Sequence, residues 1–428
     1  MQTAWKALYN TVAVPTLYTG FQALAFFNPK VRQGLLGRQS VFESLTEQLA
    51  IARSFDRTAW FHFTSVGEFE QAKPLIDHVY PQTRIVLTYF SPSVAANAYR
   101  YPLADTAIYL PLDSRQNAHR LFDLIQPSIL IFSKFDIWPN LVWEAKRRKI
   151  TVALIAGTLQ PNSKRLQPVA SAFFRSVHQE IDLHCVISEQ DAVRFKQLCP
   201  PAARIEVTGD TRFDRVYNQA LVVPEDEAFL PGQSTLSAPV VVAGSTYTEE
   251  EVILIESLNQ MTTVSPHLII VPHEPTPVHV QQLMERLRKS GLTYVKYSEL
   301  VEESNLSQVR VIIIDTIGIL AKLYRMADVT FVGGSFHGSV HNVMEPAAME
   351  KPILFGPTID NAHEAHQLVQ CGGAEIVNSA NQLVDVLGRW LVSPQQRQQV
   401  ARSALRVIQD NLGATERTLD HLQPYFSI

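Results

Sequence analysis

From about residue 45 onward, short apolar runs alternate with longer stretches in which apolar residues recur at helical spacing. The short runs are rich in β-branched and aromatic residues, which favour strands, whereas the longer stretches favour helices. Alternation of this kind predicts parallel sheets that carry helices on both faces. The predicted strands of a first series are residues 59–64, 84–88, 106–109, 128–132, 151–156, 184–187 and 204–208.

A second series of strands begins after a polar, proline-bearing stretch at residues 222–238, which we interpret as a linker between two domains. Its predicted strands are residues 239–243, 267–271, 309–314, 329–332, 352–354 and 374–376. The predicted helices include residues 68–79, 139–148, 248–260, 278–290 and 318–326. A helical stretch at 394–422 is expected to cross back over the first domain.

The sequence therefore predicts an α/β protein with two Rossmann-like, doubly wound domains of nearly equal size, at residues 41–222 and 223–428. An N-terminal segment at residues 1–40 precedes them. Two such domains predict a central cleft. In doubly wound sheets ligands bind beyond the carboxyl ends of the strands, so polar residues at those ends are the first candidates for a site.

The N-terminal segment carries no charged residue between Ala7 and Phe27, while Lys6 precedes this stretch and Lys30 follows it. Its length is close to the about 20 residues that cross a bilayer, but polar residues dilute its apolar character and its aromatic rings favour the headgroup layer. We interpret residues 4–27 as a hairpin or interfacial helix on a membrane surface, with a helix packed on the protein's own surface as the alternative. The basic residues behind it place the body at the cytoplasmic face of the inner (plasma) membrane.

The chain of 428 residues has 37 basic and 41 acidic side chains, which gives a net charge of −4. This mild acidity argues against a nucleic-acid partner, which normally requires a clustered basic surface. The three cysteines include no CxxC pair, and the histidines show no spacing typical of metal ligands. We therefore expect a reaction without a metal ion or cofactor.

The first candidate for chemistry is Glu68, in the sequence Ser65-Val66-Gly67-Glu68 that follows the first predicted strand. Ser65 and Gly67 suit a tight turn from strand to helix, and Glu68 falls in the first turn of that helix, where the helix dipole favours its ionised form. One interpretation is a carboxylate that only caps the helix. The other is a general base directed at a hydroxyl group, because the carboxyl ends of strands face the ligand.

The second candidate is a glycine-rich loop after the strand at 329–332. Backbone N–H groups of Gly333 and Gly334, together with a helix expected to begin near Asn342, can bind a phosphate group without a basic side chain. His341 and Glu345 then lie within reach of a nucleotide. The loop matches neither the dinucleotide fingerprint GxGxxG nor a P-loop. Polar loops also follow other predicted strands, at residues 134–140, 207–214, 243–246 and 272–275.

Together these segments resemble the 3-deoxy-D-manno-octulosonic acid (Kdo) transferase family, from about residue 4 to about residue 420. Each motif is short, but all of them occur in the family's order. They are Ser65-Val66-Gly67-Glu68, Trp138-Pro139-Asn140, Gly209-Asp210-Thr211-Arg212-Phe213-Asp214, Gly244-Ser245-Thr246, Asp315-Thr316-Ile317-Gly318, residues 331–335, His341-Asn342 with Glu345-Pro346, and Gly356-Pro357 before Asn361.

The resemblance implies a GT-B fold and a membrane-attached enzyme that transfers Kdo from CMP-Kdo to a lipid A precursor (lipid IVA) in lipopolysaccharide biosynthesis. It implies an inverting, metal-independent displacement in which Glu68 is the general base. The substrate- and donor-binding residues predicted from it are Ser65, Lys134, Asp136, Arg212, Ser245, His273, Gly333, Gly334, Ser335, His341, Asn342, Glu345 and Asn361.

The chain departs from the family's common pattern in ways that indicate a divergent branch. Pro-Arg-His-Pro is replaced by Pro272-His273-Glu274-Pro275, and two glutamates before the Trp-Pro-Asn element are replaced by Lys134 and Asp136. We expect His273, Lys134 and Arg212 to supply replacement positive charge at the donor phosphate.

Two alternatives are a GT-B nucleotide-sugar epimerase, which needs no lipid acceptor, and a non-catalytic protein that binds a sugar nucleotide. An epimerase is expected to work without residues 4–27 and on soluble substrate alone.

Overall fold

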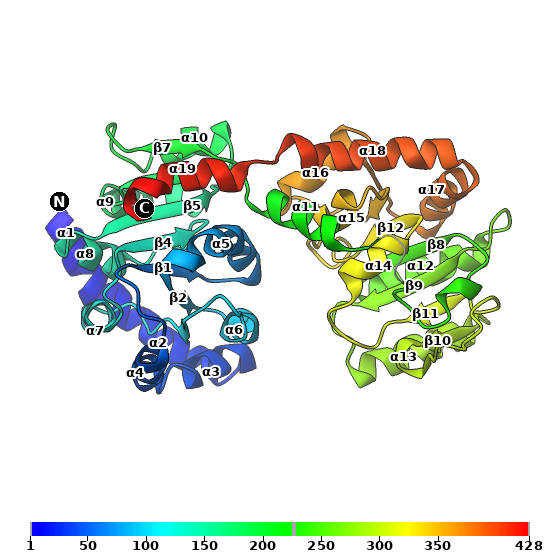
Figure 1. Ribbon diagram of the computed structural model, residues 1–428, viewed down its shortest axis with the longest axis horizontal. Coiled ribbons are helices and arrows are strands. Elements are labelled where there is room, and N and C mark those ends of the chain that lie inside the picture. Colours follow the sequence, from blue (N-terminus) through cyan, green and yellow to red (C-terminus); the bar gives the residue numbers. More distant parts are fainter. Residues whose placement is uncertain (1, 225–227, 427–428) are drawn as a thin grey trace. The chain divides into compact units, whose positions relative to one another are not determined.

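The computed structural model describes residues 2–224 and 228–426, which form two compact units (Figure 1). The first unit consists of the described residues of Met1–Arg215 and Leu412–Ile428, and the second of those in Val216–Asn411. Each unit is built on a sheet of seven parallel strands. The predicted α/β architecture with two parallel sheets is confirmed.

The first sheet has the order β3-β2-β1-β4-β5-β6-β7, so the chain reverses its direction of travel across the sheet between β1 and β4. Ligands bind at such a switch point in doubly wound sheets. The strands are β1 (Thr58–Phe63), β2 (Arg84–Tyr89), β3 (Thr106–Tyr109), β4 (Ile129–Ser133), β5 (Thr151–Gly157), β6 (Leu183–Val186) and β7 (Ile205–Val207). The helices of this unit are α1 (Gln2–Leu8), α2 (Val14–Ala25), α3 (Pro29–Leu36), α4 (Val41–Ile51), α5 (Val66–Val79), α6 (Pro92–Tyr99), α7 (Arg115–Ile125), α8 (Pro139–Arg147), α9 (Pro168–His178), α10 (Glu189–Phe195) and α19 (Ala414–Phe426).

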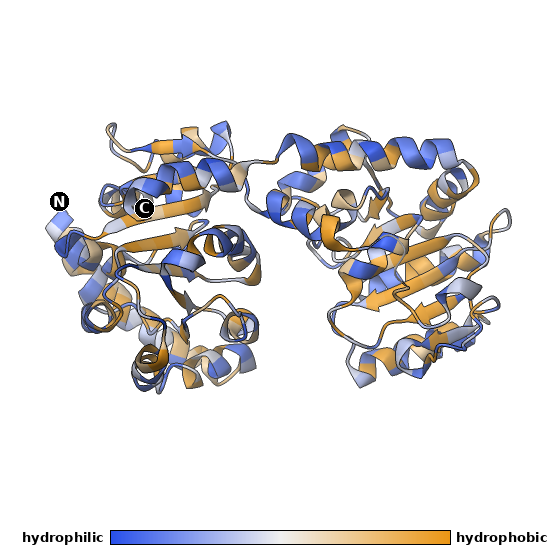
Figure 2. Cartoon of the chain, in the orientation of Figure 1, coloured by the Kyte–Doolittle hydropathy of each residue, from blue (hydrophilic) through white to orange (hydrophobic). Residues whose placement is uncertain are grey.

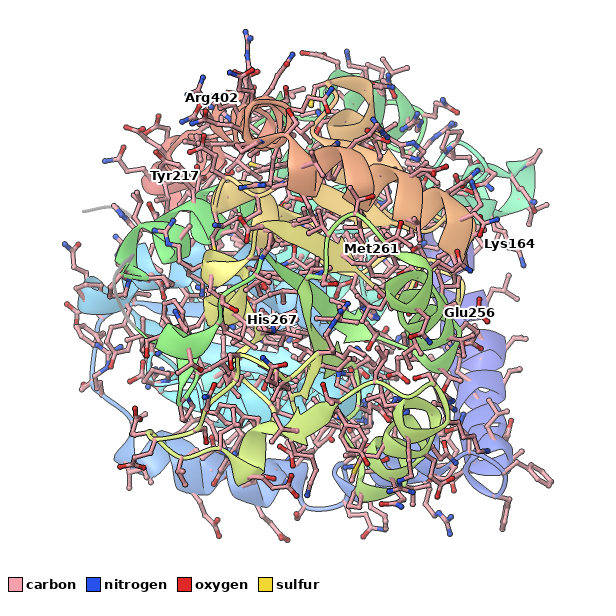
Figure 3. All side chains as sticks on the ribbon, turned by 90° about the vertical axis from the view of Figure 1, so that its right-hand side faces the viewer. Lys164, Tyr217, Glu256, Met261, His267 and Arg402 are labelled. Atoms are coloured by element: carbon pink, nitrogen blue, oxygen red, sulfur yellow. The ribbon has the colours of Figure 1, made fainter. Side chains whose placement is uncertain are left out.

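The second sheet has the order β10-β11-β9-β8-β12-β13-β14, with its switch point between β8 and β12. Its strands are β8 (Val240–Thr246), β9 (His267–Pro272), β10 (Tyr294–Lys296), β11 (Val311–Ile313), β12 (Val329–Val332), β13 (Ile353–Phe355) and β14 (Ala374–Ile376). Its helices are α12 (Thr248–Gln260), α13 (Pro277–Lys289), α14 (Leu320–Met326), α15 (Met344–Ala348), α16 (His363–Gln370), α17 (Ala380–Val392) and α18 (Pro394–Asp410), while α11 (Arg212–Val222) begins in the first unit and continues into the second. In Figure 3, turned by 90° from the view of Figure 1, the label of His267, at the start of β9, lies near the middle of the picture, and that of Arg402, on α18, lies near the top.

The central strands are buried along their whole length, as in β1 and β9. Parallel strands covered on both faces appear in a sequence as nearly continuous apolar runs, which is why the pattern located them. Figure 2 shows these strands as the most hydrophobic parts of the ribbon, while α18 is largely polar. The sequence missed only β10 among the described strands, because its three residues are half-buried at the edge of the sheet.

The C-terminal helical stretch is divided between the two units. Helix α18 ends at Asp410, and Gly413, with φ +83°, turns the chain into α19. Leu422 and Phe426 of α19 join the core of the first unit. The predicted second domain extended to residue 428, whereas residues 412–426 belong to the first unit, because the apolar face of α19 packs there.

The predicted linker also differs from the division observed. The two compact units divide between Arg215 and Val216, inside α11, before the polar stretch at 222–238 begins. Residues 225–227 of that stretch lie outside the described residues.

The N-terminal segment forms α1, a π-helical turn (Tyr9–Ala13) and α2. Tyr9 is buried, donates a hydrogen bond to Asp113 Oδ2 at 2.9 Å and stacks on Phe173, so the start of the segment is packed on the first unit. No helix among the described residues is long and apolar enough to cross a membrane. Beyond Tyr9, large apolar side chains are exposed on this segment and on α3: Val12, Leu17, Tyr18, Leu24, Phe26, Phe27 and Leu36.

Candidate active site

The turn between β1 and α5 places Glu68 at the carboxyl edge of the first sheet. Ser65 caps α5, and its Oγ accepts a hydrogen bond from the Glu68 backbone N–H at 3.4 Å. Glu68 Oε2 in turn accepts hydrogen bonds from the N–H groups of Thr64 and Ser65. This reciprocal capping box confirms the helix start inferred from the sequence. The Ser65 hydroxyl is committed to the cap.

Capping uses only one of the two carboxylate oxygens of Glu68, since Oε1 has no hydrogen-bond partner among the described residues. The side chain is 4% exposed. Burial, and secondarily the nearby Asp136, raise the pKa of Glu68 to about 7, against the opposing effects of the two backbone hydrogen bonds and Lys134. A carboxylate whose pKa lies near the operating pH is suited to take a proton from a hydroxyl group.

Lys134 and Asp136 lie close enough to Glu68 to influence its ionisation. They follow β4, which pairs with β1, so the three side chains meet at the switch point of the sheet. Lys134 adopts a left-handed backbone conformation with φ +68°. Asp136 forms an ion pair with Arg165, at 3.1 Å.

Trp138 is held in place by a buried hydrogen-bond chain that starts on β1. Its indole N–H donates to His62 Nε2 at 2.8 Å, so His62 carries its proton on Nδ1 and donates it to Thr88 Oγ1 at 2.9 Å. Burial lowers the pKa of His62 to about 3, which keeps this imidazole neutral. Trp138 therefore has a defined structural role beside the site.

The motif at residues 209–214 lies at the start of α11 and connects it to the rest of the first unit. Arg212 binds the buried Asp210 at 2.7 Å, and Asp210 also accepts a hydrogen bond from Gln71 of α5. Asp214 accepts hydrogen bonds from the N–H groups of Gly413 and Thr415, at 2.6 Å each. The motif thus holds α19 on the first unit, and the charge of Arg212 is balanced by Asp210.

In the second unit the remaining candidates gather at one edge of the sheet. Ser245 lies at the carboxyl end of β8, while His273, residues 333–335 and Asn361 follow β9, β12 and β13. These four strands are consecutive neighbours in the sheet. The end of β8 and the loop after β12 approach closely, because a Cβ on Gly333 would lie 2.4 Å from the Ser245 carbonyl oxygen. The glycine is required at this position by the contact between the two backbones.

The expected phosphate cradle at Gly333 and Gly334 is already filled by the protein. The N–H of Gly333 donates to the Gly244 carbonyl, and that of Gly334 donates to Glu250 Oε1 at 2.7 Å. Glu250 is fully buried and also accepts from the N–H groups of Phe336, at 3.1 Å, and Tyr247, at 2.7 Å. In this structure both glycine amides therefore already have acceptors within the protein, and their binding of a donor phosphate stays a prediction.

The helix expected near Asn342 is α15, which begins at Met344 and has only five residues. Asn342 precedes the N-cap residue Val343, accepts the Met344 N–H at 3.1 Å and donates to Glu345 at 2.9 Å. Ser335 is fully buried and accepts the Gly356 N–H at 2.6 Å. These contacts make the loop rigid, and the Ser335 hydroxyl lies inside the protein.

Asn361 holds the same loop from the other side. Its side-chain amide bonds both the N–H and the carbonyl of Val340, at 3.1 and 2.9 Å. Its observed contacts therefore order the loop that precedes His341.

His341 and His273 belong to a cluster of four stacked rings with Tyr247 and His337. The centroid distance is 4.3 Å both for His273–His341 and for Tyr247–His337. Burial, with His273 and His337 nearby, lowers the pKa of His341 to about 4, so its imidazole is neutral near pH 7. Its Nε2 is buried without a hydrogen-bond partner among the described residues.

Sequence reasoning missed Glu250 and the Tyr247–His337 pair, because the contacts that define them join separate loops. It also missed His178, His184 and Cys199, the one group of three potential metal ligands in the described part of the chain. His178 Nδ1 lies 3.0 Å from His184 Nε2, and burial lowers the pKa of both histidines. The group lies in the core of the first unit, distant in sequence from the Glu68 turn.

Known proteins match this chain over nearly its whole length. The family model for 3-deoxy-D-manno-octulosonic-acid transferase matches residues 39–215. The chain is 27% identical to the 3-deoxy-D-manno-octulosonic acid transferase of Haemophilus influenzae, over 98% of this chain and 99% of the relative. It is 29% identical to that of Chlamydophila psittaci, over 96% of each chain. The chain is thus similar to Kdo transferases over nearly its whole length.

Solved structures that resemble this chain show its fold. A putative UDP-N-acetylglucosamine 2-epimerase from Listeria monocytogenes has a TM-score of 0.58 and 12% identity, covering 86% of this chain and 96% of that one. A glycosyltransferase from Rickettsia africae has a TM-score of 0.55 and 8% identity, covering 87% of this chain and 100% of that one. The chain therefore has the GT-B fold that the resemblance implies.

Proposed function

We propose that this protein is a glycosyltransferase that moves Kdo from CMP-Kdo to a lipid A precursor during lipopolysaccharide biosynthesis. The observation that carries the proposal is the likeness to Kdo transferases over nearly the full length of both chains. The site supports it independently, because a buried carboxylate with a free oxygen lies at the switch point of the first sheet.

In the proposed reaction Glu68 acts as the general base. Its Oε1 takes the proton of an acceptor sugar hydroxyl while that oxygen forms a bond to the anomeric carbon of Kdo. The bond from this carbon to the phosphate oxygen breaks on the opposite face, and CMP leaves with the electron pair. Inversion at the anomeric carbon follows from this in-line geometry. We assign donor binding to the open side chains of the second unit, above all Ser245, His273 and His341.

The direct test is incubation of purified protein with CMP-Kdo and lipid IVA, with the product mass measured. We expect lipid that is heavier by whole Kdo residues, together with free CMP. Unchanged lipid after complete recovery of intact CMP-Kdo would refute the proposal. The mass also reports how many Kdo residues are added.

An epimerase activity is the second candidate, since solved 2-epimerases share the fold. Their identity to this chain is only 12–14%, and they match it in fold alone. Conversion of a soluble UDP-sugar in the absence of lipid would favour this candidate, and we expect none.

We also propose that the exposed apolar residues of the N-terminal segment attach the protein to the cytoplasmic face of the inner membrane. Leu24 and Phe27 are 54% and 89% exposed at the end of α2. Apolar side chains without protein partners gain free energy when they enter the headgroup and acyl boundary of a bilayer.

The double substitution Leu24→Ser/Phe27→Ser is expected to weaken binding to vesicles of phosphatidylglycerol and phosphatidylcholine by about tenfold or more, from the loss of two large apolar side chains. Co-sedimentation measures this. The matched control is Val278→Ser/Val301→Ser, which removes two exposed apolar side chains from the second unit. Equal binding by both variants would show that the N-terminal segment does not attach the protein.

A further inference from the structure

A groove of about 650 Å³ lies in the first unit between α2, α3 and α4. Its volume falls within the about 300–1,000 Å³ that is usual for sites of small ligands. Figure 1 shows these three helices together, next to α7. The apolar part of the wall is formed by Ala25, Phe26, Leu35, Leu36, Val41 and Phe42.

The groove lies at the same edge of the sheet as Glu68. Arg38, in its wall, donates hydrogen bonds to the carbonyls of Phe90, at 2.7 Å, and Leu110, at 2.8 Å. These two residues directly follow β2 and β3, just as Thr64 follows β1. Because β1, β2 and β3 are adjacent and strands are about 4.8 Å apart, the ends of β1 and β3 are separated by about 10 Å.

The charge of the groove complements an anionic amphiphile. Its lining includes Arg32 and Arg38 and no acidic residue. Arg38 is committed to backbone carbonyls and to the faces of Phe90 and Tyr109. Arg32 is exposed, and no ion pair is recorded for it among the described residues. An apolar trough beside an accessible guanidinium suits an acyl chain that carries a phosphorylated head.

We propose that this α2–α4 groove binds an acyl chain of the lipid acceptor and so positions the acceptor sugar at Glu68. The inference rests on the proposed transfer to a lipid. With an acyl chain in the groove, the head of the lipid lies at the carboxyl end of β3, two strands away from Glu68. The groove shares Tyr18 and Phe26 with the exposed apolar surface of the N-terminal segment, whereas Leu24 and Phe27 are not part of its lining.

The test compares two tryptophan substitutions on α2. Ala25 lines the groove and Ala23, on the same helix, is exposed outside it. Ala25→Trp fills the groove and is expected to raise KM for lipid IVA by about tenfold or more, the effect of about two buried methylene groups. Ala23→Trp adds the same side chain to the surface and should leave KM unchanged. Transfer to acceptor from which the acyl chains have been removed should be equal in both variants.

A second pair on α3 guards against misfolding of Ala25→Trp. Leu36→Asp puts a charge on the groove wall, and Gln33→Asp puts the same charge on an exposed position outside it. We expect only Leu36→Asp to raise KM for lipid IVA. Equal KM values within both pairs would overturn the groove assignment. The assignment would also be overturned if Ala25→Trp bound vesicles more weakly by a factor that equals its rise in KM. The groove would then bind the membrane and not the acceptor.

Failure of the underlying function gives a different result. If the wild-type protein transfers Kdo to neither the acylated nor the deacylated acceptor, the proposed transferase activity fails. If the wild type is active but the variants do not separate, only the groove assignment fails.

Discussion

Replacement of Glu68 by glutamine is expected to lower kcat by about 10²–10⁴-fold, the usual contribution of a general base. Glutamine keeps an oxygen that can accept the capping N–H groups of Thr64 and Ser65, so α5 should begin at the same residue. The affinity for CMP-Kdo should stay within about twofold, because the donor-binding residues that we assign lie in the other unit. Steady-state kinetics measure kcat, and calorimetric titration of Glu68→Gln with CMP-Kdo, without acceptor, measures the donor affinity.

The pH dependence provides a second signature of the same residue. Because burial raises the pKa of Glu68 to about 7, kcat/KM of the wild type should rise with pH through this value as the base ionises. This limb should be absent from the residual activity of Glu68→Gln. A pH profile that is flat between pH 6 and about 8 in the wild type would contradict the assignment.

Stability should change in the opposite direction to activity. The raised pKa means that the folded state binds the Glu68 proton more tightly than the unfolded state does. The contribution of the protonated group to stability is complete below the usual pKa of a glutamate and is lost as the pH rises through about 7. Glu68→Gln should therefore raise Tm at pH 8 and change it little at pH 4. The control Glu43→Gln, an exposed glutamate in the first turn of α4, should change neither activity nor Tm.

Replacement of Glu250 by alanine is expected to weaken CMP binding by about tenfold or more and to destabilise the second unit. The substitution leaves the buried N–H groups of Tyr247, Gly334 and Phe336 without their acceptor. Each unsatisfied buried group costs about 1–3 kcal/mol. Tyr247 and His341, which stack on each other, belong to the segments that Glu250 joins. The relative position of the two rings should therefore become less well defined.

Thermal unfolding and titration with CMP measure both effects of Glu250→Ala. The matched control is Glu256→Ala, on the exposed side of the same helix, where Figure 3 labels it. The control should match the wild type in both measurements. If Glu250→Ala binds CMP with wild-type affinity, the segments around Tyr247 and Gly334 do not form the donor site. This conclusion holds even if the Tm of the variant is lower.

Much of the fold follows from local patterns. β3, β12, β14 and α12 occur at the residues that the alternation of apolar and polar positions predicts. The Glu68 cap follows from four consecutive residues, because a capping box is defined within a single turn. The family motifs then indicate which loops form the candidate site. These motifs lie at the carboxyl ends of strands, which a doubly wound sheet brings to one edge.

The roles of individual loop residues do not follow from local patterns. A glycine pair predicts free amides, but whether those amides face a ligand or a carboxylate depends on which other loop lies against them. Here the Gly244 carbonyl accepts the Gly333 amide, and Glu250, over eighty residues earlier in the chain, accepts the Gly334 amide. Likewise, the sequence shows that Arg212 is positively charged. That this charge is paired with Asp210 is known only from the folded turn.

By itself, the sequence determined the two parallel sheets, the order of the motifs and the position of Glu68, because apolar periodicity and capping act over a few neighbouring residues. Only the tertiary structure decided that Glu68 is buried with a raised pKa, that Glu250 fills the glycine loop, and that α19 returns to the first unit. Burial and hydrogen bonding between distant segments are properties of the packed chain, and no short stretch of residues contains them.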